Sequence, residues 1–180
     1  IECCKPLISN KKILDFGCGH GGFLLKVQEL VKQAHGLEPD EGDRSFFREQ
    51  GLTVFTNMKE LQGEQYDLIT LFLVLEHLHD PREILKSLKS HLLPKGKILI
   101  EVPNADDALL KLYKNKGFQE FNYWGCHLFI YTDRSLEKAE VAPANQEGAG
   151  AEFVEGATSL LEIIIGLHDG KLNVQKGDGS

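Results

Sequence analysis

The feature that most constrains this chain is a glycine-rich turn directly after a short apolar run. Residues 12–16 read Lys-Ile-Leu-Asp-Phe, and four glycines follow closely: Gly17, Gly19, Gly21 and Gly22. A short apolar run is typical of a strand inside a parallel sheet. Glycines let the backbone turn sharply and approach a ligand. Apolar residues at helical spacing over 23–31 predict a helix whose first N–H groups point at whatever lies over the turn.

Two nucleotide-binding patterns overlap in this turn. Gly17, Gly19 and Gly22 satisfy G-x-G-x-x-G, the dinucleotide pattern. Asp15 followed by Gly17, Gly19 and Gly21 also satisfies D-x-G-x-G-x-G. The glycines alone are weak evidence, because either pattern can occur in a turn that serves only packing.

A carboxylate follows at the spacing that a nucleoside site requires. Residues 34–38 read as a second strand, and Glu38 at its end lies 19 positions after Gly19. A carboxylate at this point can accept hydrogen bonds from both ribose hydroxyls of a nucleoside. Strand, glycine turn, helix, strand and carboxylate in this order therefore predict a nucleoside site.

Strands and helices continue to alternate as far as residue 104. Strands are predicted over 52–55, 66–72 and 97–102. Helices are predicted over 43–50 and over 81–93, the second ended by the Pro-Lys-Gly turn at 94–96. This alternation predicts an α/β fold, a doubly wound, mostly parallel sheet of Rossmann-like type, with its ligand at the carboxyl ends of the strands.

The pattern loosens in the last third of the chain. Helices are predicted over 105–116 and 133–140, with an aromatic-rich connection over 117–132 and a loop over 141–150. Two strands, 160–167 and 171–175, flank an Asp-Gly pair, which predicts a C-terminal antiparallel hairpin. We expect a single domain over 1–180, with a cofactor-binding core at 10–104, a lid and acceptor region at 105–150 and the terminal hairpin at 151–180.

Composition narrows the class of protein. A length of 180 residues suits one domain with a sizeable core, and the net charge of −7 argues against a dedicated nucleic-acid binder. The cysteines at 3, 4, 18 and 126 form no C-x-x-C pair, which fits a reducing, cytoplasmic setting. The longest apolar run, residues 68–75, is too short to span a bilayer. We therefore expect a cytoplasmic protein with neither a nucleic-acid nor a membrane partner.

Several segments together resemble the class I S-adenosylmethionine-dependent methyltransferases, in particular the small-molecule branch. The resemblance covers residues 10–139 and ends at Ala139. The segments that carry it are residues 13–21, 36–40, 66–69, 74–78, 92–104 and 127–132. It implies methyl transfer from S-adenosylmethionine to O, N or C of a small molecule, with S-adenosylhomocysteine as the product.

The resemblance also implies a set of cofactor contacts. Asp15 would orient the glycine turn from beneath, and Glu38 would bind the ribose. Asn57 and Met58 occupy the place of the adenine contact, where the family often has an acid. The implied cofactor-binding residues are Asp15, Gly17, Cys18, Gly19, Gly21, Glu38, Pro39, Asn57, Met58 and Phe72.

The catalytic candidates are His127, Tyr123 and His77. Methyl transfer needs an acceptor held in line and deprotonated, and a histidine with a pKa near neutral suits the base. A packed aromatic lid explains His127 and Tyr123 equally well, and the segment of His77 is commonly structural in the family. Glu76, His77, His79 and His127 are also metal-ligand types, but nothing in their spacing demands a metal, and none is expected.

Two alternatives remain open from sequence. An NAD-dependent oxidoreductase would share G-x-G-x-x-G and Glu38, although Asp15 and the segments at 76–77 and 94–96 argue against it. A catalytically inactive, nucleoside-binding methyltransferase-like module would explain the missing adenine-site acid and the irregular C-terminal part. The acceptor, the oligomeric state and the nature of residues 140–150, an insertion or a break, stay open.

Overall fold

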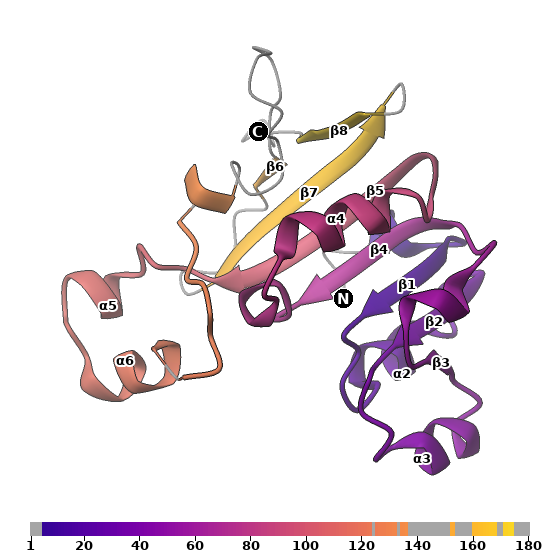
Figure 1. Cartoon of the computed structure of the whole chain (residues 1–180), viewed down its shortest axis with the longest axis horizontal. Coiled ribbons are helices and arrows are strands. Elements are labelled where there is room, and N and C mark those ends of the chain that lie inside the picture. The colour runs from indigo at the N-terminus through magenta and orange to yellow at the C-terminus, as the bar shows by residue number, and fades with distance from the viewer. Residues whose placement is uncertain are drawn as a thin grey trace.

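The computed structural model describes residues 5–123, 125–132, 134–136, 152–153, 160–168 and 171–174. The described strands form one sheet in the order β3-β2-β1-β4-β5-β7-β6, with β8 paired to β7 (Figure 1). The first five strands run parallel to one another: β1 (Lys12–Phe16), β2 (Gln33–Leu37), β3 (Thr53–Phe55), β4 (Tyr66–Phe72) and β5 (Leu92–Pro103). The predicted doubly wound, parallel sheet is confirmed.

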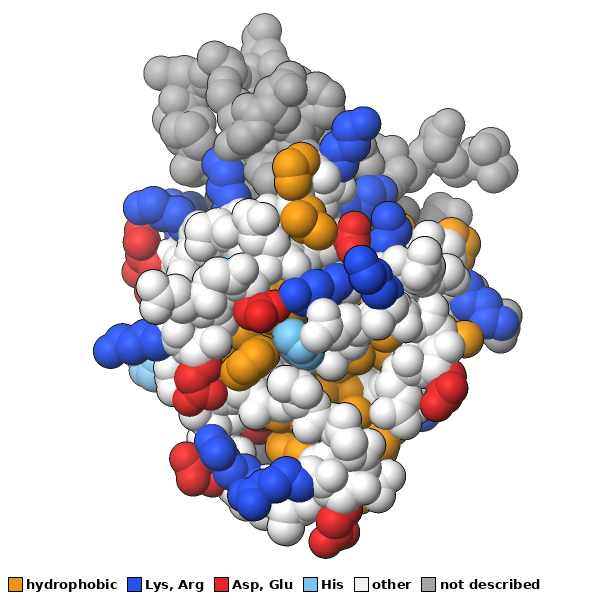
Figure 2. Space-filling model, turned by 90° about the vertical axis from the view of Figure 1, so that its right-hand side faces the viewer, with side chains coloured by type: hydrophobic (Ala, Val, Ile, Leu, Met, Phe, Trp, Pro, Cys, Tyr) orange, Lys and Arg blue, Asp and Glu red, His pale blue; other side chains and the backbone are white. Residues whose placement is uncertain are grey.

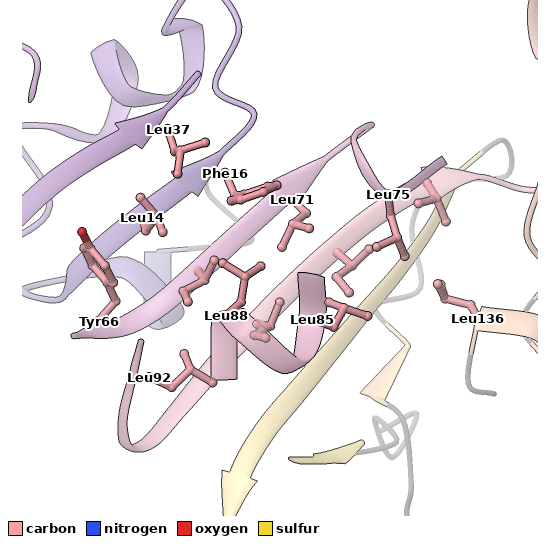
Figure 3. Packing of buried hydrophobic residues seen from close by; sticks show 14 of the residues in the cluster. Leu14, Phe16, Leu37, Tyr66, Leu71, Leu75, Leu85, Leu88, Leu92 and Leu136 are labelled. Carbon is pink, nitrogen blue, oxygen red and sulfur yellow. The ribbon is translucent and has the colours of Figure 1, made fainter. Parts of the chain in front are cut away.

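The sheet is buried because its central strands are apolar on both faces. Ile13 and Leu14 point to opposite faces of β1, and neither is exposed to solvent. Figure 3 shows one side of this core, where Leu14 of β1 and Leu71 of β4 pack with Leu88 of the helix α4 (Pro81–Lys89). The reading of residues 12–16 and 66–72 as buried strands is confirmed to the residue.

Short helices connect the parallel strands. They are α2 (Gly22–Val27), α3 (Arg44–Glu49), α4 and the 3-10 turns η1 (Met58–Leu61) and η2 (Leu75–His77), while α1 (Lys5–Ile8) precedes β1. The start of α4 follows the predicted signal, because the Asp80 side chain accepts a 3.1 Å hydrogen bond from the Glu83 N–H and Pro81 occupies the first turn.

The predicted end of α4 is wrong. The helix stops at Lys89, where the Ser90 hydroxyl donates to the Ser87 carbonyl, and the apolar pair at 92–93 begins β5. The Pro-Lys-Gly turn lies inside β5 as an irregularity in its pairing with β4, between Leu92 opposite Tyr66 and Lys97 opposite Leu68. Apolar residues at 88 and 92 satisfy helical spacing, but pairing with β4 gives Leu92 a buried place in the sheet.

The helix predicted over 105–116 is also wrong. The chain forms two shorter helices, α5 (Ala108–Lys111) and α6 (Lys116–Asn122), so the predicted connection over 117–132 begins in a helix. Each has its own cap, since Asp107 accepts from the Leu109 N–H and Asn115 from the Phe118 N–H. The left-handed backbone of Lys114, at φ +46°, separates the two helices. In Figure 1 they stand away from the sheet beyond the carboxyl end of β5.

The C-terminal strands extend the sheet in the antiparallel sense. β7 (Leu160–His168) pairs with β5, while β6 (Glu152–Phe153) and β8 (Lys171–Val174) each pair with β7. The Asp-Gly pair, the loop predicted over 141–150 and the second half of the helix predicted over 133–140 lie outside the described residues. None of the helices in the described part has the length and apolar character needed to cross a bilayer.

Candidate functional site

The glycine turn between β1 and α2 depends on left-handed backbone at three positions. Gly17, Gly19 and Gly21 have φ angles of +76°, +50° and +75°, a region that other residues adopt at a cost. A Cβ atom built on Gly17 would lie 2.5 Å from Cγ2 of Val74, so the turn packs closely against the loop after β4. A Cβ atom built on Gly19 would meet no atom within 4 Å, so this glycine borders open space.

Glu38 closes the turn from the neighbouring strand. β1 and β2 pair with Phe16 opposite Leu37, which places Glu38 beside the turn. Its Oε2 accepts a 2.9 Å hydrogen bond from the Gly19 N–H, and its Oε1 accepts a 3.1 Å bond from the Asp40 N–H. An ionised carboxylate has about four lone-pair sites, so Glu38 retains the capacity to accept further hydroxyl donors.

Asp15 lies beneath the turn and is 3% exposed. Its Oδ1 accepts a 2.7 Å hydrogen bond from the hydroxyl of Thr70 on β4. Burial raises the pKa of Asp15 to about 6, the Thr70 bond acts in the opposite direction, and the negative charge of Glu38 adds to the rise. The turn is therefore bordered by two acidic groups close enough to repel one another.

Two further side chains hold the turn in place. Cys18 packs its sulfur against Gly36 of β2. The pKa of its thiol is raised to about 12, mainly by burial and further by the negative charges of Asp15 and Glu38. His20 forms an exposed ion pair with Asp43 at the start of α3, which raises the pKa of His20 above its usual value. The first group is an inert thiol, and the second links the turn to α3.

The remaining cofactor candidates are placed by local structure. Asn57 caps η1 by accepting from the Lys59 N–H, and Met58 packs against the core. The Phe72 ring lies edge-on to Phe23 of α2 with centroids 5.0 Å apart, which places it in the core below the turn. Pro39 is exposed beside Glu38.

The loop after β4 carries a second cluster of polar groups. Glu76 in η2 is fully buried, and both its carboxylate oxygens lack a hydrogen-bond partner among the described residues. Burial is the largest cause of its raised pKa, which the backbone of Glu76 itself and then the nearby His77 and His127 lower in part. The Glu76 carbonyl accepts hydrogen bonds from the N–H groups of Leu128, at 2.8 Å, and Phe129, at 3.2 Å. Main-chain bonds therefore fasten residues 128–129 to η2.

His77 and His127 come together in this cluster. Their rings meet edge to face with centroids 4.8 Å apart. The Nδ1 atom of His77 lies 2.9 Å from the Cys126 carbonyl, and Nδ1 of His127 lies 2.9 Å from the Asn122 carbonyl. Because a carbonyl can only accept, both Nδ1 atoms carry hydrogen, and in the neutral rings Nε2 carries the lone pair. Tyr123, the third catalytic candidate, is 59% exposed at the end of α6.

A hollow of about 590 Å³ lies where the same loop leads into α4. Two elements supply its walls, the start of α4 and the chain from Phe129 to Ser135. Its lining residues are His79, Asp80, Pro81, Arg82, Phe129, Ile130, Tyr131 and Ser135. Aromatic, cationic and hydroxyl groups therefore face a space large enough for a small organic molecule.

Sequence reasoning missed Thr70, Val74 and Cys126 as parts of the site. Thr70 offered a signal, since it is a lone hydroxyl inside the apolar strand at 66–72. Val74 and Cys126 offered none, because their contacts with Gly17 and His77 depend on the packing of distant segments.

The residues around the turn fit a nucleoside that carries positive charge. The open space at Gly19 leaves room for a ligand close to the backbone, and Glu38 supplies a carboxylate for hydroxyl groups. Asp15 and Glu38 together favour a cation. A dinucleotide pyrophosphate would add negative charge beside the same two acids.

Comparison with known proteins gives a family match over most of the chain. A family model described as "Methyltransferase domain" matches residues 2–139. The ubiquinone biosynthesis O-methyltransferase of Actinobacillus pleuropneumoniae is 31% identical over 108 residues, covering 52% of this chain and 46% of that protein. A tRNA U34 carboxymethyltransferase of Campylobacter hominis is 31% identical over 111 residues, which cover 54% of this chain and 38% of that protein. The chain thus spans less than half the length of these relatives.

Solved structures agree on the fold. A Thermotoga maritima protein described as a SAM-dependent methyltransferase, possible histamine N-methyltransferase, superimposes with a TM-score of 0.65. The superposition covers 92% of this chain and 86% of that one at 16% sequence identity. Identity this low carries the fold alone.

Proposed function

Because this chain belongs to the methyltransferase domain family, we propose that it transfers a methyl group from S-adenosylmethionine to O, N or C of a small molecule. The family match confirms the resemblance to class I S-adenosylmethionine-dependent methyltransferases, and S-adenosylmethionine is the cofactor of that family. The NAD-dependent oxidoreductase is not retained as an alternative.

The observation that carries the proposal is the pairing of Asp15 and Glu38 around the glycine turn. S-adenosylmethionine has a positively charged sulfonium and an ammonium group, and it contains no phosphate. Two acids placed together favour positive charge between them; burial is the main cause of the raised pKa of Asp15, and the charge of Glu38 adds to it. We assign ribose binding to Glu38 and orientation of the turn to Asp15. The backbone of Gly17, Gly19 and Gly21 would form the wall of the cofactor site.

The further cofactor contacts follow the resemblance. Cys18 and Pro39 flank the turn and Glu38, and Asn57 and Met58 stand at the proposed adenine side. Phe72, at the end of β4, supports the proposed cofactor site through its ring contact with Phe23 of α2. We assign the cofactor-binding core to residues 10–104 and the acceptor region to 105–150.

When bound, S-adenosylmethionine supplies a methyl group that its charged sulfur already activates. The chain's own task is then to orient the acceptor and to remove its proton. His77 and His127 suit that task, because each donates from Nδ1 to a backbone carbonyl and keeps Nε2 as the basic atom. Tyr123 at the neighbouring helix end is proposed to contact the acceptor.

We favour a small acceptor over a nucleic acid. One matched relative is named for action on tRNA, so the absence of a nucleic-acid partner remains a proposal. In its support, acidic and basic side chains are interspersed over the face seen in Figure 2, and the net charge is −7. Tight RNA binding requires basic side chains gathered on one face. The hollow beside α4, of about 590 Å³, has the size of a small-molecule site.

The test is calorimetric titration with S-adenosylmethionine, S-adenosylhomocysteine and NAD in parallel. Binding of the two sulfur nucleosides without NAD is the expected result. A preference for NAD would refute the assignment of Asp15 and Glu38 to a cationic nucleoside. Donor binding without turnover, across panels of phenols, amines and thiols, would instead favour a catalytically inactive nucleoside-binding module.

A further inference from the structure

We propose that His77, His127 and Cys126 form a binding site for a divalent transition metal, with Zn²⁺ as the best match. One ring nitrogen of each histidine and the Cys126 sulfur all lie within 4.8 Å of one another. Two imidazoles and a thiol are the donor types that zinc prefers. Sequence spacing gave no reason to expect this set, because its members come from two segments that meet only in the fold.

The hydrogen bonds of the two histidines match those of metal ligands. A ligating histidine almost always donates its second ring N–H to a carbonyl or carboxylate, which fixes its tautomer and orientation. His77 donates from Nδ1 to the Cys126 carbonyl and His127 to the Asn122 carbonyl, both at 2.9 Å. The Nδ1–H of each ring is therefore committed to a carbonyl oxygen, and one of these bonds ties the residue bearing the thiol to His77.

Glu76 provides the second, independent observation. Its carboxylate is fully buried without a hydrogen-bond partner among the described residues, an arrangement that is unfavourable unless a positive charge lies nearby. Glu76 lies in η2 directly before His77, one of the two histidines of the cluster. A divalent cation bound by these histidines would supply the missing positive charge.

The geometry requires only a small closing movement. Tetrahedral zinc binds nitrogen at about 2.0–2.1 Å and sulfur at about 2.3 Å, so its ligand atoms lie roughly 3.4 Å apart. Starting from at most 4.8 Å, the side chains converge by about 1 Å or somewhat more. Three protein ligands leave the fourth position open, which is the pattern of sites where zinc binds water or substrate.

The metal site adds to the proposed function. Only its role in methyl transfer rests on that function being correct. With the metal bound, His77 and His127 act as its ligands and no longer as bases, and the zinc instead lowers the pKa of a coordinated hydroxyl or thiol. It would therefore select acceptors that present an oxygen or sulfur able to coordinate the metal. Metal binding itself depends on neither the donor site nor turnover.

Cobalt(II) titration of the chelator-treated full chain tests the proposal, because tetrahedral cobalt absorbs strongly in the visible range. All proteins carry Cys3→Ser and Cys4→Ser, which removes the two cysteines outside the described residues. We expect one equivalent of cobalt to bind, a thiolate-to-cobalt charge-transfer band to appear, and zinc to displace the cobalt. An excess of Mg²⁺ should not displace it, because magnesium prefers oxygen ligands.

Variants then assign the ligands. Cys126→Ser should abolish the charge-transfer band, and His77→Gln and His127→Gln should each weaken cobalt binding by more than about 100-fold, beyond the loss typical of an outer partner. His79→Gln, two residues from His77, is the matched control and should bind cobalt like the parent. Thermal unfolding checks that each variant folds, and His127→Asn replaces His127→Gln if the latter does not.

The outcomes separate the metal site from the donor site. A retained band in Cys126→Ser, or His77→Gln binding as tightly as His79→Gln, would overturn the metal site. Glu38→Ala should lose S-adenosylmethionine binding and keep the cobalt spectrum, because the two sites share no residue. The failure of one proposal is thereby visible while the other stands.

Discussion

Asp15 and Thr70 face each other on neighbouring strands, and the Thr70 hydroxyl donates a 2.7 Å hydrogen bond to the Asp15 carboxylate. Both residues are almost fully buried. The hydrogen bond favours the ionised acid, but burial outweighs it and raises the pKa to about 6. The chain thus retains an acid beneath the glycine turn at the expense of stability.

Asp15→Asn should therefore stabilise the ligand-free protein at neutral pH. The native pKa lies above the unfolded value of 3.8, so the native state binds the proton more tightly, and stability falls as the pH rises from about 4 to about 6. Asn lacks this titration. The pH-dependent part of the difference in unfolding free energy should approach at most about 3 kcal/mol above pH 7. Urea unfolding across this pH range measures it, and a difference independent of pH would contradict the raised pKa.

Ionisation of Asp15 should lower folding stability but strengthen donor binding. The ionised form attracts the cationic donor, so S-adenosylmethionine affinity should fall as the pH drops through about 6, the pKa that burial gives Asp15. Asp15→Asn should bind the donor more weakly at neutral pH and lose this pH dependence. Calorimetry in buffers of different ionisation enthalpy checks this, because binding near the pKa should release a proton. A parallel profile in Asp15→Asn would assign the effect to another group.

Two alanine substitutions in the glycine turn should have different effects, one mainly on folding stability and the other mainly on donor binding. Gly17→Ala places a methyl group 2.5 Å from Val74 in a left-handed conformation, so we expect a loss of more than about 2 kcal/mol of folding stability. Gly19→Ala meets no neighbour and should cost only the backbone strain, about 1–2 kcal/mol. Its methyl group enters the proposed donor space and should greatly weaken donor binding. Equal loss of stability in both variants, by thermal unfolding, would contradict the packing difference.

Glu38→Ala should abolish donor binding while leaving the fold intact. The variant removes the carboxylate proposed to accept the ribose hydroxyls, and hydrogen bonds to a charged group contribute about 1.5–3 kcal/mol each. We expect at least a 100-fold loss in affinity for S-adenosylmethionine, about the effect of two such bonds. Glu41→Ala is the control, since Glu41 is exposed and pairs with Arg44. Unchanged donor affinity in Glu38→Ala would remove Glu38 from the ribose site.

The cap of α4 gives a prediction about stability alone. Asp80→Ala removes the side-chain oxygen that accepts from the Glu83 N–H and should lower stability by about 1 kcal/mol. Asp80→Asn keeps an oxygen in the same place and should be close to the parent protein. Chemical unfolding distinguishes the two, and an equal loss in both would indicate that charge rather than capping matters at this position.

Much of the parallel half of the fold could be predicted because its signals are local. The run at 12–16, the strand at 66–72 and the start of α4 at Pro81 are read correctly from apolar spacing and a cap. The end of α4 could not be read in this way, because Leu92 fits a helix by spacing and a strand by its pairing with Tyr66. Asp107 and Asn115 are cap residues that mark the division between α5 and α6, but the apolar spacing over 105–116 favours one continuous helix and conceals it.

The residues of the candidate site also differ in whether local sequence predicts them. The spacing of Gly19 and Glu38 predicts that they share one site, and the structure joins them by a hydrogen bond. Thr70 and Cys126 could not be placed, because a contact between distant segments is decided by packing rather than by the neighbouring sequence. His77 and His127 were named separately, and only the folded chain shows that their rings touch.

The attachment of residues 128–129 to η2 has a consequence for how such a protein can diversify. The carbonyl of Glu76 holds Leu128 and Phe129 by their N–H groups, and every residue except proline offers the same donor. The position of this segment is therefore largely indifferent to the side chains it carries. Mutation can exchange those side chains, and with them the chemistry presented beside the hollow, without moving the backbone that presents them. In a laboratory library, positions 128–130 would be the first to randomise.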